Sequence, residues 1–193
     1  MLAKKLSEHT IILASGSPRR QQFFRDLDLP FEIRLKEVKE IYPEHLKASE
    51  ITDFLADLKS KPFDSELTDN DLLITSDTIV WLNKSALGKP KNFEEAYDML
   101  QRLSGKSHEV ITSVSIKTNT SQKIINDTTK VYFKDLTTEE INYYITTYEP
   151  YDKAGAYGIQ EWIGKIGIDK IEGSYFNVMG LPVHKLYKEL MNL

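Results

Sequence analysis

An apolar run at residues 72–82 with an aspartate near its middle constrains this chain more than any other feature. Leucine, isoleucine and valine dominate the run, as they do in a buried strand. A charge inside such a strand is costly unless it is paired, hydrogen-bonded or bound to a metal. Asp77 is therefore predicted to bind Mg²⁺ or to activate a water from a strand end or a cleft face. The alternative is a solvent-facing side chain on the polar side of an edge strand.

The remaining sequence pattern predicts strands and helices in a mixed order. Strands are expected at residues 10–14, 31–38, 108–117 and 123–134. Helices are expected at residues 18–28, 49–60, 93–103 and 137–148, and from residue 182 to the end. The helix near residue 137 opens with a capping box of Thr137 and Glu140. Because strands and helices do not alternate strictly, the order favours an α+β or mixed α/β sheet over a doubly wound fold.

Length and composition define the broad class of the protein. The 193 residues suffice for one domain, or for one domain with two lobes around a cleft. A net charge of -4 gives no basic footprint for nucleic acid, and the absence of cysteine excludes disulfides, zinc–thiolate sites and cysteine nucleophiles. No segment has the pattern of a signal peptide or the length of a membrane span. We therefore expect a cytoplasmic protein with no nucleic-acid or membrane partner.

Residues 15–20, with the sequence Ser-Gly-Ser-Pro-Arg-Arg, form the first candidate site. A strand that runs into a Gly/Ser loop and a helix start favours an anion there, through backbone N–H groups and the helix dipole. The serine hydroxyls and the arginines add further donors. The alternative is a plain capped helix, with Ser17 as its N-cap, Pro18 at its first position and both arginines solvated.

Two lysines and one glycine-rich loop complete the candidates. Lys59 ends the second predicted helix and Lys89 follows the Asp77 strand, so either ammonium could neutralise a triphosphate. Each is otherwise a surface lysine. The loop at residues 152–160 has closely spaced glycines and alanines, which suggests a backbone pressed against a base or another segment. Gln160 could then read a base edge through its amide, unless the loop holds no ligand.

Taken together, these segments resemble the Maf family of nucleoside triphosphate pyrophosphatases. The matching pieces span nearly the whole chain in the family's order. They are residues 13–20 (LASGSPRR), 55–59 (LADLK), 76–78 (SDT), 88–90 (GKP), 103–110 (LSGKSHEV), 152–160 (DKAGAYGIQ), 171–175 (IEGSY) and 180–182 (GLP).

The resemblance implies a single domain over residues 1–193, with an elongated mixed sheet and two lobes around a central cleft, similar to inosine triphosphate pyrophosphatases. It implies hydrolysis between the α and β phosphates with a divalent cation, Mg²⁺ or Mn²⁺. The partner is a small nucleotide substrate, and a homodimer is compatible with the family.

The resemblance also implies roles for individual residues. Asp77 matches the proton acceptor, and Glu40 with Asp77 matches the acidic positions near the metal. The phosphate-binding positions are matched by Ser15, Arg19, Lys59 and Lys89. The positions tied to substrate choice are matched by Arg19, Thr78 and Gln160.

Residues 153–160 resemble the subgroup that acts on dTTP and UTP, including modified pyrimidine nucleotides. Three positions or segments depart from the family pattern. Lys39 stands where an acidic residue is usual, which predicts weaker metal binding. Residues 161–168 replace the usual Gly-rich continuation, which predicts an altered wall of the base pocket. Ser76 replaces a more usual alanine.

Other functions remain as alternatives. One is a nucleotide-binding regulator of septum formation and cell division that does not hydrolyse its ligand and would not need Asp77. A second is direct DNA binding, against which the negative net charge argues. A third is a pyrophosphatase with another base preference, such as 7-methyl-GTP or ITP, which would differ only around Thr78 and Gln160.

Overall fold

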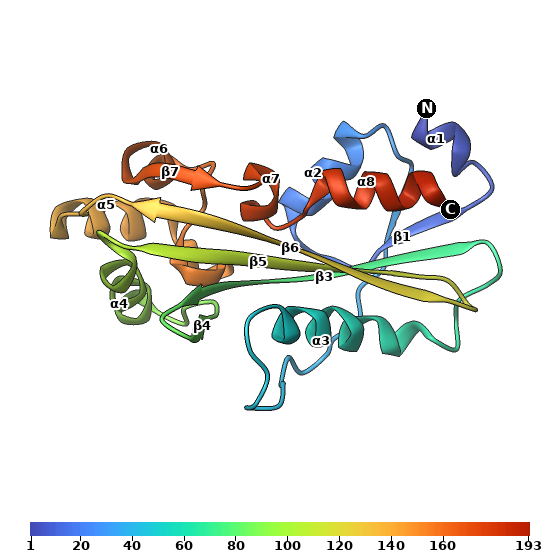
Figure 1. The fold of residues 1–193 in the computed structure, drawn as a ribbon, viewed down its shortest axis with the longest axis horizontal. Coiled ribbons are helices and arrows are strands. Elements are labelled where there is room, and N and C mark those ends of the chain that lie inside the picture. Colours follow the sequence, from blue (N-terminus) through green and yellow to red (C-terminus); the bar gives the residue numbers. More distant parts are fainter. The chain divides into compact units, whose positions relative to one another are not determined.

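The computed structural model describes residues 1–193, which divide into two compact units (Figure 1). Unit 1 comprises residues 1–77, 112–127 and 180–193, and unit 2 comprises residues 78–111 and 128–179. The strands are β1 (Thr10–Leu13), β2 (Glu32–Ile33), β3 (Asp71–Leu82), β4 (Ser85–Leu87), β5 (Ser107–Lys117), β6 (Gln122–Phe133) and β7 (Ile168–Glu172). The α-helices are α1 (Leu2–Lys5), α2 (Pro18–Asp26), α3 (Ser49–Ser60), α4 (Phe93–Leu103), α5 (Thr138–Tyr148), α6 (Trp162–Gly167), α7 (Tyr175–Val178) and α8 (Val183–Asn192).

The strands form one mixed sheet, as the element order predicted. Its strand order is β2-β1-β3-β5-β6-β7, with β4 paired to β3. Strand β1 is parallel to both β2 and β3, whereas the pairs β3–β4 and β6–β7 are antiparallel. The long strands β3, β5 and β6 each contribute residues to both units.

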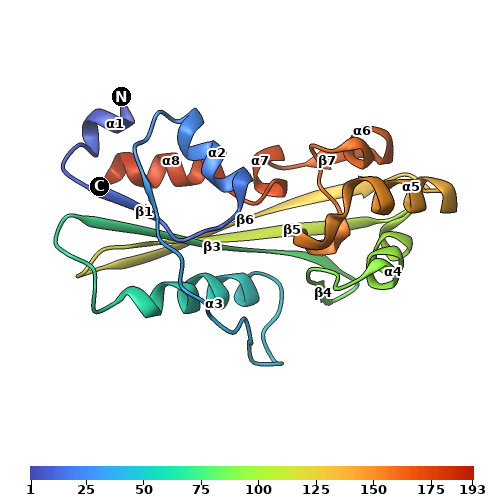
Figure 2. The ribbon, with the colours of Figure 1, turned by 180° about the vertical axis from the view of Figure 1, so that it is seen from behind.

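In unit 1, helices cover both faces of the sheet. Figures 1 and 2 show α3 on one face and α2 with α8 on the other. Helix α3 buries Ile51, Leu55 and Ala56, and α2 buries Phe23 and Phe24. Strand β1 is buried on both faces in consequence, which explains its uninterrupted apolar sequence.

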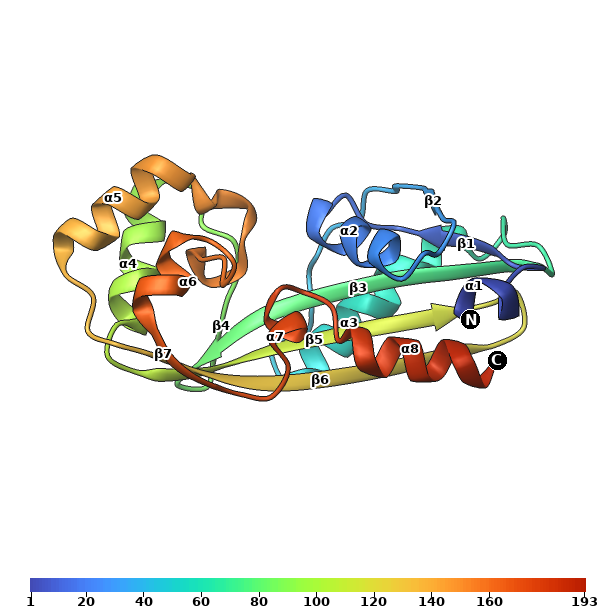
Figure 3. The same cartoon turned by 90° about the horizontal axis from the view of Figure 1, so that it is seen from above.

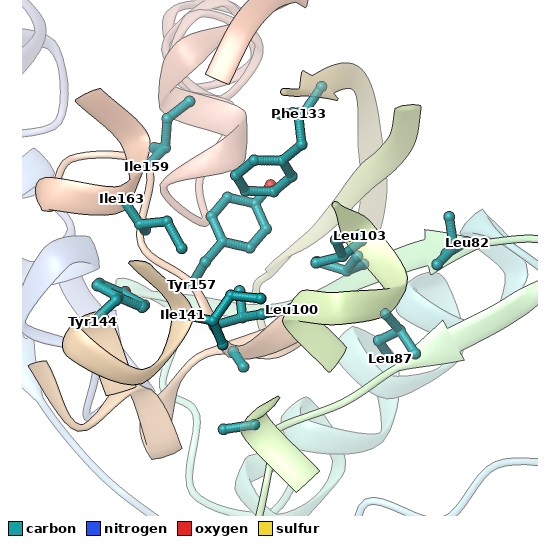
Figure 4. Close-up of a cluster of buried hydrophobic side chains, with 14 of the residues drawn as sticks. Leu82, Leu87, Leu100, Leu103, Phe133, Ile141, Tyr144, Tyr157, Ile159 and Ile163 are labelled. Carbon is teal, nitrogen blue, oxygen red and sulfur yellow. The ribbon is translucent and has the colours of Figure 1, made fainter. Parts of the chain in front are cut away.

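In unit 2, helices α4, α5 and α6 gather on one side of the strands (Figure 3). They enclose a core to which the strands contribute Leu82 and Phe133, α4 contributes Leu100, and α5 contributes Ile141 (Figure 4). Residues 153–160 belong to this core rather than to the surface, because Tyr157 and Ile159 are buried within it.

Most of the predicted elements are confirmed. The helices at residues 49–60 and 93–103 have the predicted bounds, and the capping box of Thr137 and Glu140 is present. Ser17 occupies the N-cap position of α2, but its side chain makes no capping hydrogen bond. None of the helices combines the length and apolar character that crossing a membrane requires.

The predicted strand at residues 31–38 was wrong in extent, since only Glu32 and Ile33 pair with β1. Beyond them the chain leaves the sheet, and the Lys36 ammonium bonds the Pro62 carbonyl at 2.7 Å and Glu66 at 2.5 Å. Strand β7 and helices α1, α6 and α7 were not predicted, because each is too short to show a clear hydrophobic period.

His108 gives unit 2 a pH-dependent stability. The residue is 3% exposed, its Nε2 lies 2.7 Å from the Tyr157 hydroxyl, and its Nδ1 has no hydrogen-bond partner. Burial lowers the pKa of His108 from 6.5 to about 3. The unfolded chain therefore takes up a proton between those pH values that the folded protein excludes, so the free energy of unfolding decreases as pH falls through this window.

We expect His108→Gln, whose amide can still reach Tyr157 but does not titrate, to remove this dependence. Urea unfolding between pH 7 and 4 measures how the free energy of unfolding changes with pH. This slope should be steeper for the native protein than for the variant by up to ~1.4 kcal/mol per pH unit. His184→Gln is the matched control, because that side chain is 57% exposed. Equal slopes for native protein and His108→Gln would contradict the assignment.

Candidate active site

The register of two parallel strands brings the predicted site residues of unit 1 to one edge of the sheet. Leu13 at the end of β1 is opposite Ile74 in β3, and the Ala14 amide bonds the Ile74 carbonyl at 2.9 Å. The loop that follows β1 therefore lies beside Ser76 and Asp77. The carboxyl ends of parallel strands are where open α/β sheets bind ligands.

The loop between β1 and α2 is held by its own first serine. Ser15 is buried, its hydroxyl accepts from the Ser17 amide at 3.3 Å, and its carbonyl accepts from the Gln21 side chain at 3.3 Å. Pro18 then opens α2, so the amino end of a nine-residue helix follows the loop directly. This arrangement suits an anion, as the sequence predicted.

Arg20 ties this helix to two other segments of unit 1. Its Nη1 donates to the Ser76 carbonyl at 2.9 Å, and its Nε donates to the Gly180 carbonyl, just before α8, at 2.8 Å. Removal from water lowers the pKa of the guanidinium from 12.5 to about 10, while Asp77 acts in the opposite direction. Arg20 therefore remains a cation at neutral pH.

Asp77 points to the face of the sheet that α3 covers. Side chains alternate along a strand, so Asp77 shares a face with Thr75, whose hydroxyl donates to the Ala56 carbonyl of α3 at 2.6 Å. Lys59 lies one turn further along α3 and places its ammonium 2.6 Å from Asp77 Oδ1. The Asp77 side chain is only 8% exposed, and Lys59 compensates its charge.

Glu40 reaches the same ammonium from the irregular segment after β2. Its Oε1 lies 3.0 Å from Lys59 Nζ, and its side chain is 47% exposed. The anchoring of Lys36 at Pro62 and Glu66 holds this segment near the end of α3. Two carboxylates from distant parts of the chain thus meet at one lysine.

Glu40 and Asp77 are the side chains that could hold a divalent cation together with a phosphate. No group of three or more histidine, cysteine or acidic side chains is arranged to hold a metal by itself. Mg²⁺ does not require such a cage, because it usually binds through one or two carboxylates, waters and substrate phosphates. The oxygen ligands of Glu40 and Asp77 match that pattern.

The other predicted site residues belong to unit 2. Thr78 follows Asp77 directly on β3 and is half-buried, Lys89 is exposed in the segment after β4, and Gln160 is half-buried at the end of the 152–160 loop. The structure therefore gathers Ser15, Glu40, Lys59 and Asp77 in unit 1, and it assigns Thr78, Lys89 and Gln160 to unit 2.

The glycines of the 152–160 loop are pressed against the protein's own side chains. Gly155 has a φ of +69°, and a Cβ there would lie 2.7 Å from Val80 of β3. A Cβ on Gly158 would lie 2.9 Å from the Glu161 carboxyl carbon and 3.1 Å from Lys153 Cε. The closely spaced glycines were predicted to contact either a base or another segment of the chain. The contact with another segment is confirmed.

Arg20 is the residue beside the candidate site whose separate contacts the sequence did not predict. The sequence indicates it only as one of two arginine donors beside the loop. The signal was its spacing, because Arg20 precedes the buried Phe23 and Phe24 by three and four residues and so lies on the buried face of α2.

The chain is similar to known proteins over nearly its whole length. A family model described as Maf-like protein matches residues 10–193. The dTTP/UTP pyrophosphatase of Flavobacterium johnsoniae is 63% identical over 193 residues, with all of both chains covered. The proteins of that name from Flavobacterium psychrophilum and Christiangramia forsetii are 59% and 58% identical, over all of this chain and 98% of theirs.

Among solved structures, the Staphylococcus aureus Ham1 protein aligns with a TM-score of 0.46 and 17% identity. The alignment covers 65% of this chain and 72% of that one. A likeness of this size does not bear on the site.

We expect Arg20→Met to destabilise the protein by about 2–3 kcal/mol, because it leaves the Ser76 and Gly180 carbonyls without their charged donor. Arg25→Met is the matched control on the same helix. Arg25 is exposed, contacts Gln21 and Gln22 only at 3.4 Å and lies 5.9 Å from the centre of the Phe31 ring, so its replacement should change stability by no more than ~1 kcal/mol. Urea unfolding of both variants measures the difference, and equal losses would contradict the role of Arg20.

Proposed function

The chain belongs to the Maf family, and we propose from this premise that it hydrolyses dTTP and UTP to the monophosphate and pyrophosphate. The observation that carries the proposal is the meeting of Asp77 and Glu40 at Lys59, beside a Ser/Gly loop and a helix amino end. Full-length relatives that carry the name dTTP/UTP pyrophosphatase support the choice of substrates. Modified pyrimidine nucleotides belong to the same substrate class.

Asp77 is the base that prepares the attacking water in this proposal. A carboxylate at hydrogen-bond distance from a water can orient it and accept its proton as the oxygen attacks phosphorus. The bond between the bridging oxygen and the attacked phosphorus then breaks, and pyrophosphate leaves. Lys59 keeps the buried carboxylate compensated before the substrate arrives.

The cations of the site stabilise the negative charge of the phosphates. Within unit 1, Ser15 and the amino end of α2 would bind a phosphate, and Arg19 and Lys59 would supply positive charge. Lys89 of unit 2 is also proposed as a phosphate-binding residue. Phosphoryl transfer depends mainly on such positioning and electrostatic stabilisation. Arg20 acts indirectly in this scheme, because it fixes α2 against Ser76.

Glu40 and Asp77 would hold a divalent cation, Mg²⁺ or Mn²⁺, together with the phosphates of the nucleotide. When bound, such an ion neutralises phosphate charge and polarises the P–O bonds. Lys39 is exposed next to Glu40, and its positive charge is expected to weaken metal binding at this position.

Selection of the base is proposed for Arg19, Thr78 and Gln160. An amide offers both a donor and an acceptor, which is what discrimination of a pyrimidine edge requires. A cytoplasmic location is predicted from the sequence, and a homodimer is compatible with the resemblance to the family.

The test is pyrophosphate release from dTTP, UTP, CTP, GTP, 7-methyl-GTP and ITP with Mg²⁺ or Mn²⁺. We expect a preference for dTTP and UTP that is lost on chelation. Asp77→Asn should lower kcat by roughly 10²–10⁴-fold, because it removes the proton acceptor. It should still fold, since Lys59 keeps Glu40 as a partner.

Asp26→Asn, an exposed position on α2, is the control and should retain full activity. Preference for another base would retain the chemistry and reject the substrates. A folded protein that binds these nucleotides but hydrolyses none would instead support the non-hydrolysing regulator of septum formation and cell division.

A further inference from the structure

A second cluster of charged side chains lies within unit 2 and has no part in the chemistry described above. Its centre is Lys153, whose side chain is 9% exposed. The ammonium lies 2.6 Å from Asp152 Oδ1 and 3.1 Å from Glu161 Oε1. Asp152 is 57% exposed whereas Glu161 is 19% exposed, so Glu161 is the more buried partner of this ammonium.

Tyr144 of α5 connects this ion pair to the backbone of the loop. Its hydroxyl donates to Glu161 Oε2 in a short hydrogen bond and accepts from the Gly158 amide at 3.0 Å. The ring is fully buried among the core side chains of unit 2 (Figure 4). Burial, followed by the hydrogen bond to Glu161, raises the pKa of Tyr144, so the hydroxyl remains a neutral donor.

Gln160 lies in the chain between Gly158 and Glu161, which are both held by hydrogen bonds. On one side the Gly158 amide is fixed by Tyr144, and on the other Glu161 is fixed by both Tyr144 and Lys153. Gly158 has no room for a side chain, because the ion pair packs against its backbone. Glu161 is also the N-cap residue of α6. The backbone around Gln160 therefore has little freedom to move.

We infer that Glu161 and Tyr144 are positioning residues for Gln160, and that through it they set discrimination between pyrimidine bases. This inference rests on the proposed function of Gln160 in reading the base. Glu161 supplies the carboxylate that holds the loop, because it bonds both the Tyr144 hydroxyl and the Lys153 ammonium.

The test compares Glu161→Gln and Tyr144→Phe with the native protein. Glu161→Gln should fold, because Lys153 keeps Asp152 and the new amide oxygen can still accept from Tyr144. Tyr144→Phe keeps the buried ring and removes both hydrogen bonds. Tyr143→Phe, the half-exposed neighbour on α5, and Glu139→Gln, an exposed position in its first turn, are the matched controls. Circular dichroism establishes that each variant is folded.

UTP and CTP are the substrates, because they differ only at the base edge that an amide would read. In each loop variant we expect KM for UTP to rise about tenfold, kcat to stay within about threefold, and the UTP-to-CTP ratio of kcat/KM to fall about tenfold. In Tyr143→Phe and Glu139→Gln, all three quantities should stay within about twofold of those of the native protein. An unchanged ratio, or a loss confined to kcat, in either folded variant would overturn the inference.

Binding of α,β-imido-UTP and α,β-imido-CTP, measured by calorimetry on the same variants, separates this inference from the proposed function. A native protein that binds the UTP analogue preferentially but hydrolyses no UTP would reject the proposed hydrolysis. The positioning role would then be decided by whether the preference for the UTP analogue falls about tenfold in Glu161→Gln and Tyr144→Phe. An unchanged preference would overturn it.

Discussion

The ion pair between Lys59 and Asp77 is the interaction on which the candidate site depends. An aspartate that is 8% exposed within a central strand is tolerated only with a compensating charge, and the ammonium of Lys59 lies 2.6 Å away. The same ammonium also pairs with Glu40, which lies in a segment outside the sheet. One lysine at the end of α3 therefore brings two carboxylates together, and the proposed hydrolysis depends on this pair.

The parallel pairing of β1 with β3 determines what lies next to this ion pair. Because Leu13 is opposite Ile74, the loop after β1 and the amino end of α2 lie beside Ser76 and Asp77. A slip of one residue would turn Asp77 to the opposite face of the sheet, away from α3. Arg20 secures the arrangement by bonding the Ser76 carbonyl and the segment before α8. The register of β1 against β3 thus determines both where α2 begins and which side chains lie in the candidate site.

The sequence predicted those parts of the molecule whose cause is local. Helices at residues 49–60 and 93–103 show a clear period, and the aspartate in an apolar strand predicted a buried, paired charge, which Asp77 is. The sequence could not predict that residues 34–40 leave the sheet, since a lysine contact with Pro62 and Glu66 holds them there. The hydrogen bond of Arg20 to Gly180 joins residues 160 positions apart, and that of Tyr144 to Glu161 joins two different elements 17 positions apart. No local sequence pattern encodes such pairs.

The most direct test of this account is a double-mutant cycle on stability with Lys59→Met and Asp77→Asn. If Lys59 compensates the buried carboxylate, each single variant disturbs the same interaction. Urea unfolding should then give a coupling of about 1–3 kcal/mol between the two changes. Effects that add to within ~0.3 kcal/mol would show that Lys59 and Asp77 act independently, and would contradict the claim that this ion pair organises the site.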